Sequence, residues 1–184
     1  MEMLGLYEKA LDNSGRILRG IRGHHLGRPT PCAGWDVNAL LGHLISHTQM
    51  YGAGGLAAGE VFVPAEAGED PGWAYAIAAK AALRTFSTPG AAERTFRLPA
   101  GEVPGSVAIG LAMTEAAVHG WDIATATGKS ATIDSDVAEA LLAFHRSAVL
   151  EFQLGQDAAF GPEVPVDADR SASDRLVGLF GRQV

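Results

Sequence analysis

Cysteine is nearly absent from this chain, since Cys32 is the single one among 184 residues. A single cysteine excludes an internal disulfide, which fits a protein of a reducing compartment. It also excludes a zinc module built on several cysteines, so histidine and carboxylate side chains would have to hold any metal ion. Cys32 lies in a loop rich in proline and glycine with no base near it in the sequence, and we expect it to be structural.

Positive charge and long apolar runs are scarce as well. The formal net charge is −7, which argues against nucleic-acid binding because that activity normally needs a basic face. No apolar run approaches the roughly 20 residues that span a bilayer. The first residues lack the basic region and cleavage site of a signal peptide. We therefore expect a cytoplasmic protein with neither a membrane nor a nucleic acid as its partner.

The composition is that of a globular protein, with 47% hydrophobic and 19% charged residues. A chain of 184 residues has the length of one ordinary domain with a full core. No repeat, low-complexity tract or linker divides it. We predict a single domain over residues 1–184.

The hydrophobic pattern predicts helices joined by long loops. Helical spacing of apolar residues covers about residues 2–22, 36–51, 72–86, 106–127 and 135–152, with a short last helix at 173–180. Asp36 and either Asp134 or Ser135 are predicted to cap helix starts, and Gly128 to end the fourth helix. Residues 95–98 are the only extended candidate. We predict an all-α bundle whose long loops permit crossover connections.

Glu115 and His119 stand out in the most apolar of these helices. Their spacing of four residues places them one turn apart on the same helix face. A carboxylate buried in such a helix without a partner is costly. A divalent metal ion, bound by both side chains from one helix, would supply that partner.

His43 and His47 repeat this spacing in a second apolar stretch, residues 40–47. One histidine from that stretch would complete a set of two histidines and one carboxylate, which leaves a coordination position for water or substrate. His47 is then a further ligand, a proton carrier, or a residue that lines the pocket. A buried polar network without metal explains the pattern of spacings equally well.

Three stretches resemble one protein family, in the same order along the chain. Residues 30–44, TPCAGWDVNALLGHL, resemble the opening of actinobacterial DinB-like proteins, and residues 115–122, EAAVHGWD, resemble the E-x-x-x-H-x-W-D helix of that group. Residues 173–182, SDRLVGLFGR, resemble its closing D-R-L-x-x-x-x-G-R motif. Within the superfamily, the chain most resembles the mycothiol-dependent maleylpyruvate isomerase group and its metal-binding relatives.

This resemblance implies a DinB-like four-helix bundle with a short extra C-terminal helix. It also implies a metal held by His43, Glu115 and His119, with zinc as the first candidate and nickel as the second. In the thiol-dependent relatives, the metal activates the thiol of mycothiol, which then attacks an electrophile. The residues after the predicted bundle are too few for the isomerase's additional C-terminal domain, which is expected to help form the substrate cleft, so we do not expect the isomerase activity itself.

Several other residues invite a functional interpretation. Asp122 either orients a metal ligand or bonds the backbone of a loop. Trp35 and Trp121 are expected to be packing residues, and His145 to be structural or at an interface. The remaining candidates, expected to be solvated, are His24, His25, Arg84, Arg94 and Arg97.

The leading hypothesis is therefore a metal-dependent thiol S-transferase that joins mycothiol to small electrophilic substrates, with His47 as the catalytic residue. The alternatives are a non-catalytic metal- or ligand-binding bundle and a metal-dependent hydrolase. No distinct general-base motif favours the hydrolase. We also expect a homodimer, because DinB-like bundles often pair through their helices.

Overall fold

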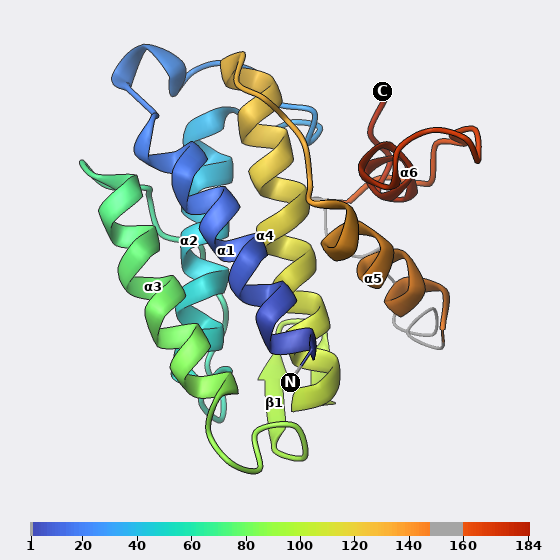
Figure 1. The fold of residues 1–184 in the computed structure, drawn as a ribbon. Helices are drawn as coiled ribbons and strands as arrows, with labels where there is room; N and C mark the ends of the chain where they lie inside the picture. Colours follow the sequence, from blue (N-terminus) through green and yellow to red (C-terminus); the bar gives the residue numbers. More distant parts are fainter. Residues whose placement is uncertain (1, 148–159) are drawn as a thin grey trace.

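The computed structural model describes residues 2–147 and 160–184 (Figure 1). Six α-helices and one short antiparallel hairpin account for most of this part of the chain. In chain order the elements are α1 (Glu2–Arg19), η1 (Gly23–His25), α2 (Val37–Ala53), α3 (Pro71–Phe86), β1 (Thr95–Leu98), β2 (Gly101–Pro104), α4 (Gly105–Thr127), α5 (Ser135–Arg146) and α6 (Ala172–Leu179).

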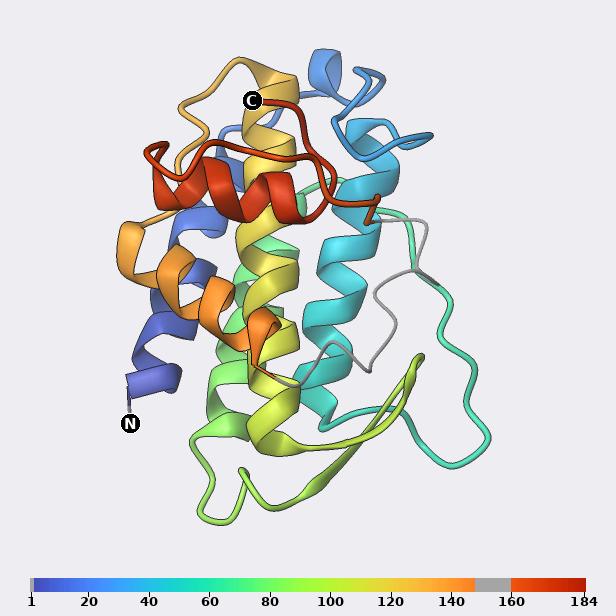
Figure 2. The ribbon, with the colours of Figure 1, turned by 90° about the vertical axis from the view of Figure 1, so that its right-hand side faces the viewer.

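The four long helices lie side by side, and each of them packs against two of the others. α1 contacts α3 and α4, and α2 contacts the same two helices from the other side. α5 and α6 pack on each other, and Figure 2 shows α6 running across α4. The C-terminal half of α4 is thus enclosed between α1, α2 and the C-terminal segment of the chain (Figure 2).

Local sequence explains where several helices begin and end. The Asp36 carboxylate accepts a hydrogen bond from the Ala39 amide at 2.9 Å, which caps α2 as predicted. Asp70 caps α3 in the same way through Trp73. Gly128 ends α4 in the left-handed conformation, with φ of 70°, also as predicted. Asp134 occupies the N-cap position of α5 without a side-chain hydrogen bond.

α4 is buried on nearly every side, which suits a helix at the centre of the molecule. Glu115, His119 and Asp122 are among its buried residues. Gly120 lets α1 approach closely, because a Cβ there would collide with the Ser14 side chain. Ser14 uses this proximity to donate a hydrogen bond to the Ala116 carbonyl at 2.7 Å.

The hairpin corrects the expectation of a purely helical chain. β1 pairs antiparallel with β2 in a register that joins Thr95 to Pro104 and Leu98 to Gly101. β1 coincides with the extended stretch expected at residues 95–98. β2 was not predicted, because its four residues include glycine and proline and resemble an ordinary loop. Phe96 and Val103 point into the core from the two strands.

α1 ends at Arg19, three residues earlier than predicted. The predicted continuation of the fifth helix to residue 152 lies outside the described residues. Among the described residues, no helix has both the length and the apolar character needed to cross a bilayer.

Candidate metal centre

The fold brings His43 of α2 against Glu115 and His119 of α4. His43 Nε2 lies 3.1 Å from Glu115 Oε2, and His119 Nε2 lies 3.2 Å from the same oxygen. One ligand atom from each of the three residues falls within 4.8 Å of the others. Residues 72 positions apart in the chain thus meet at one point, as the spacing argument requires.

Burial distinguishes this cluster from a chance meeting of surface charges. His43 is 2% exposed, Glu115 8% and His119 0%. Nε2 of His119 has no hydrogen-bond partner among the described residues, despite its proximity to Glu115. A buried nitrogen in that state normally has an unseen partner. A divalent metal bound by two imidazoles and one carboxylate is chemically suited to this position, so the residues fit the ion that the sequence predicted.

His47 lies beside the cluster, outside the set of three. Its Nδ1 is 3.9 Å from Glu115 Oε1, the carboxylate oxygen that faces away from His43. The His47 ring stands 4.2 Å from that of His43 and 4.3 Å from that of Phe62. This position suits a group that carries a proton next to the ligands better than it suits a fourth ligand.

Asp122 completes the surroundings of His119. Its Oδ2 lies 3.1 Å from His119 Nδ1, the ring nitrogen opposite the cluster. Arg182, from the end of the chain, donates to both oxygens of Asp122, at 3.0 and 2.6 Å. Of the two arrangements open from the sequence, Asp122 therefore contacts the candidate ligand His119, and carboxylates commonly contact ligands in this way in metal sites.

The carboxylates and imidazoles of the cluster shift each other's pKa values toward the charged forms. Burial raises the pKa of Glu115, but His47, His119 and His43 outweigh burial and hold that pKa well below its usual value. Burial lowers the pKa of His119, but Asp122 and Glu115 outweigh it and raise that pKa to about 9. The two carboxylates therefore favour the protonated form of the His119 imidazole.

A second set of ligand types, Cys32, His119 and Asp122, also has its ligand atoms within 4.8 Å of one another. Metal binding there is unfavourable, since Arg182 already occupies the Asp122 carboxylate. Burial, opposed in part by Arg182, raises the pKa of the Cys32 thiol to about 11, which keeps the thiol protonated. The expected structural role of Cys32 agrees with both observations.

Comparison with known proteins identifies a family whose model covers the residues of this cluster. The family model described as mycothiol maleylpyruvate isomerase N-terminal domain matches residues 7–124. The chain belongs to this family. Two uncharacterized proteins from two Mycobacterium tuberculosis strains are each 36% identical over 184 residues, covering 100% of both chains. No solved structure matches this chain.

The family match extends over the three candidate ligands and Asp122 and stops short of the C-terminal segment. Beyond the match, Phe160 and Arg182 contact His119 and Asp122 respectively, and the sequence predicted no role for either residue. Phe160 stacks on His119 with ring centroids 5.0 Å apart and an interplanar angle of 7°, and Arg182 binds Asp122. The only available signal was that Arg182 ends the stretch that resembles the closing D-R-L-x-x-x-x-G-R motif, which assigned it no role.

The other predicted residues lie away from the centre or support it. Trp35 packs edge-on against His43 at 4.6 Å, and Trp121 is buried, in keeping with packing roles. His24 is exposed as expected, whereas His25 is partly buried and its Nδ1 accepts a hydrogen bond from the Arg22 amide at 3.1 Å. Arg97 pairs with Glu102 on the hairpin. His145 is buried and lies 2.7 Å from the Thr114 hydroxyl, as a structural residue would.

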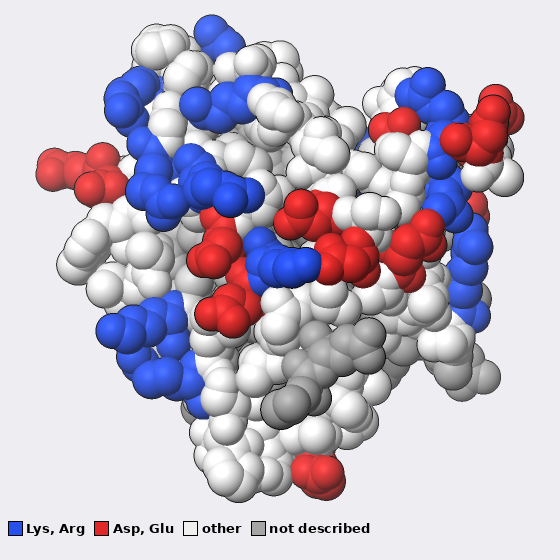
Figure 3. Space-filling view, viewed as in Figure 1, with Lys and Arg blue, Asp and Glu red and all other residues white. Residues whose placement is uncertain are grey.

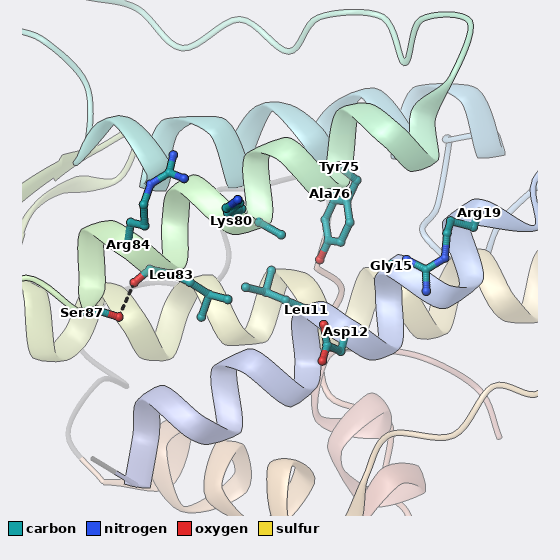
Figure 4. Close-up of a pocket in the computed structure, with 11 residues that line it drawn as sticks. Leu11, Asp12, Gly15, Arg19, Tyr75, Ala76, Lys80, Leu83, Arg84 and Ser87 are labelled. Carbon is teal, nitrogen blue, oxygen red and sulfur yellow. Dashed lines mark hydrogen bonds between the residues drawn. The ribbon is translucent and has the colours of Figure 1, made fainter.

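A groove of about 610 Å³ between α1 and α3 is separate from the cluster (Figure 4). Leu11 and Leu83 point toward each other across it, whereas Arg84 turns away. Its polar groups do not converge on one point, as those of a binding site usually do. The candidate chemistry of this family member therefore lies at the histidine–glutamate cluster.

Proposed function

We propose that this protein is a metal-dependent thiol S-transferase that joins mycothiol to a small electrophilic substrate. The observation that carries the proposal is the buried cluster of His43, Glu115 and His119, in which His119 Nε2 faces the other two side chains and makes no hydrogen bond among the described residues. Membership of a family described by mycothiol and an isomerase domain supports the choice of thiol. In this proposal the four long helices form the DinB-like bundle that the sequence resembles.

His43 and His119 would bind the metal through Nε2, and Glu115 would bind it through Oε2. Zinc is the first candidate and nickel the second, since both accept nitrogen and oxygen ligands. A bound metal of this kind would lower the pKa of a coordinated thiol and make the thiolate available near neutral pH.

His47 is our candidate for the proton transfer. Its imidazole lies beside Glu115 and outside the ligand set, so it is near the reacting group without holding the metal. The thiol proton passes to this imidazole, and the sulfur electron pair forms a bond to the electrophilic carbon. In an addition, the π bond of the substrate breaks and its electron pair takes this proton back from the imidazole. In a substitution at a C–Cl carbon, chloride leaves with the electron pair of the broken bond and the imidazole passes its proton to water, so that proton and charge balance.

Metal analysis is the first test, on protein purified without a histidine tag. We expect one divalent ion per chain in the natural protein and a large loss of metal in Glu115→Gln. Glu93→Gln, which changes an exposed carboxylate, is the matched control. A natural protein that takes up no metal would rule out the proposal.

Turnover with mycothiol and monochlorobimane tests the transferase step. We expect a fluorescent adduct with the metal-loaded protein, and a rate about 10²-fold or more lower in His47→Gln, with metal content unchanged. Adduct formation at equal rates with unrelated thiols would remove mycothiol from the proposal. Metal binding without turnover would favour the non-catalytic alternative.

The charge distribution agrees with a small-molecule partner. On the face in Figure 3, lysines and arginines form separate clusters interleaved with acidic residues, with no continuous basic surface of the kind that binds nucleic acid.

A cytoplasmic location and a homodimer are further parts of this proposal. For the dimer, Trp73 and Ile77 supply an exposed apolar pair on α3, with 67% and 53% exposure.

A further inference from the structure

Arg182 is an arginine buried as deeply as a core residue, with 2% exposure. Its Nε and Nη2 donate to the two oxygens of Asp122, and its Nη1 donates to the Phe180 carbonyl at 2.6 Å. This two-point contact fixes both the distance and the plane of the Asp122 carboxylate. Burial of a charge at this depth requires such a partner.

The end of α6 is shaped to deliver this arginine to α4. Gly181 adopts a φ of 86°, and its amide bonds the Gly178 carbonyl at 2.9 Å. The next amide, of Arg182, bonds the Val177 carbonyl at 3.0 Å. These two bonds form a Schellman turn, which reverses the chain direction and needs a residue at ease in the left-handed region.

The same turn also holds Phe160 against the cluster. The Gly161 amide donates to the Phe180 carbonyl at 3.1 Å, and Gly181 packs directly on Gly161. Phe160, the residue before Gly161, is thereby fixed in its stack on His119. The segment 160–182 thus contacts His119 in two ways, through Phe160 and through Arg182 with Asp122.

The contact to Asp122 decides which nitrogen of His119 faces the other ligands as an acceptor. An ionised Asp122 only accepts hydrogen bonds, so His119 Nδ1 must carry the proton between them. A neutral His119 then has its lone pair on Nε2, next to His43 and Glu115. Loss of Arg182 would leave the Asp122 carboxylate without its two-point contact and free to turn away from His119.

We propose that Arg182 is a positioning residue for the metal centre, which acts through Asp122 to fix the tautomer and orientation of His119. The segment 160–182 completes the site that α2 and α4 begin. This inference rests on the proposed metal binding at His43, Glu115 and His119. Outer partners of metal ligands commonly contribute about 10- to 100-fold to metal affinity.

Zinc affinity of the full-length protein, measured by competition with a chromophoric chelator, tests the proposal. We expect zinc to bind about 10- to 100-fold more weakly to Arg182→Gln than to the natural protein. Arg182→Lys, which keeps the charge and loses the two-point contact, should be intermediate. Arg170→Gln is the control, because Arg170 forms an exposed ion pair with Asp174 just before α6.

A purely structural role is distinguished by comparing affinity with stability. If Arg182→Gln lowers the melting temperature but binds zinc as tightly as the natural protein once folded, the proposal is wrong. Imidazole ¹⁵N spectra of the zinc-loaded protein supply a second readout. They should show His119 protonated at Nδ1, with that signal changed in Arg182→Gln and unchanged in Arg170→Gln.

Two outcomes separate this inference from the function on which it rests. If the natural protein binds no zinc, the metal centre itself is wrong. If the natural protein and all arginine variants bind zinc equally, only the role of Arg182 is wrong. Should Arg182→Gln fail to fold, Arg182→Lys decides, since equal affinity in that variant contradicts the need for a two-point contact.

Discussion

His119 is the residue on which the candidate chemistry depends, because it touches a carboxylate with each ring nitrogen. These carboxylates, against the opposing effect of burial, raise the pKa of its imidazole to about 9. A metal ion must therefore displace a proton from His119 before it can bind Nε2. Metal affinity and proton affinity of this residue are in direct competition.

Proton release measures that competition. At pH 7 we expect zinc binding to release about one proton from His119, and zinc affinity to rise about tenfold per pH unit between pH 7 and 8. Calorimetry in two buffers of different ionisation enthalpy gives the number of protons. Affinity that stays constant over this pH range would show that His119 is neutral before metal binds.

His145 provides a second pH effect, distinct from the metal. Burial lowers its pKa to about 4, and its Nδ1 has no hydrogen-bond partner among residues 2–147 and 160–184. The unfolded chain takes up a proton near the usual value of 6.5, whereas the folded chain does so only near 4. Stability therefore falls as the pH drops through this range.

Urea unfolding at pH 7 and pH 5 tests this effect. The loss of unfolding free energy between the two pH values should be smaller by about 2 kcal/mol in His145→Gln than in the natural protein. Other titrating groups are common to both proteins and cancel in the difference. An equal loss in both would mean that His145 titrates normally in the folded protein.

At the scale of the elements, α4 holds the site in place through its close contact with α1. Gly120→Ala would drive a methyl group into Ser14 and separate the two helices next to His119. We expect a loss of about 1–3 kcal/mol in unfolding free energy, together with weaker zinc binding. Thermal and urea unfolding measure the first, and chelator competition measures the second.

Gly5→Ala is the matched control in α1. Nothing lies within 4 Å of a Cβ at that position, and it is exposed. Alanine favours helix over glycine, so stability should rise by about 0.5–1 kcal/mol there. If both substitutions behave alike, the close approach of α1 and α4 is not what Gly120 provides.

Features of these elements that depend on residues close together in the sequence were predicted, and features that depend on distant residues were not. Spacing alone placed Glu115 and His119 on one helix face, and the capping roles of Asp36 and Gly128 were predicted because they depend on neighbours within a few residues. The first strand of the hairpin matches the extended stretch expected at residues 95–98, whereas the second was missed because four residues that include glycine and proline give no periodic signal. Arg182 was missed since its partner Asp122 is 60 positions away, and no local pattern records such a contact.

At the scale of the whole molecule, α3 presents an exposed pair of large apolar side chains. Trp73 and Ile77 lie one turn apart on α3 and are 67% and 53% exposed. We expect a homodimer through this surface, and Trp73→Glu to shift the protein toward monomer in sedimentation experiments. Val61→Glu, at an exposed loop valine, should leave the association unchanged. A natural protein that sediments as a monomer at high concentration would contradict the dimer.

The contact between Arg182 and Asp122 has a consequence for the end of the chain. If the docked C-terminal segment strengthens metal binding by some factor, thermodynamic linkage requires bound metal to strengthen docking by the same factor. The amides of Gly181 and Arg182, which hold the turn closed, should then exchange with solvent more slowly once zinc is bound. The terminal turn would serve as a built-in reporter of metal occupancy, readable by hydrogen exchange without any assay of catalysis.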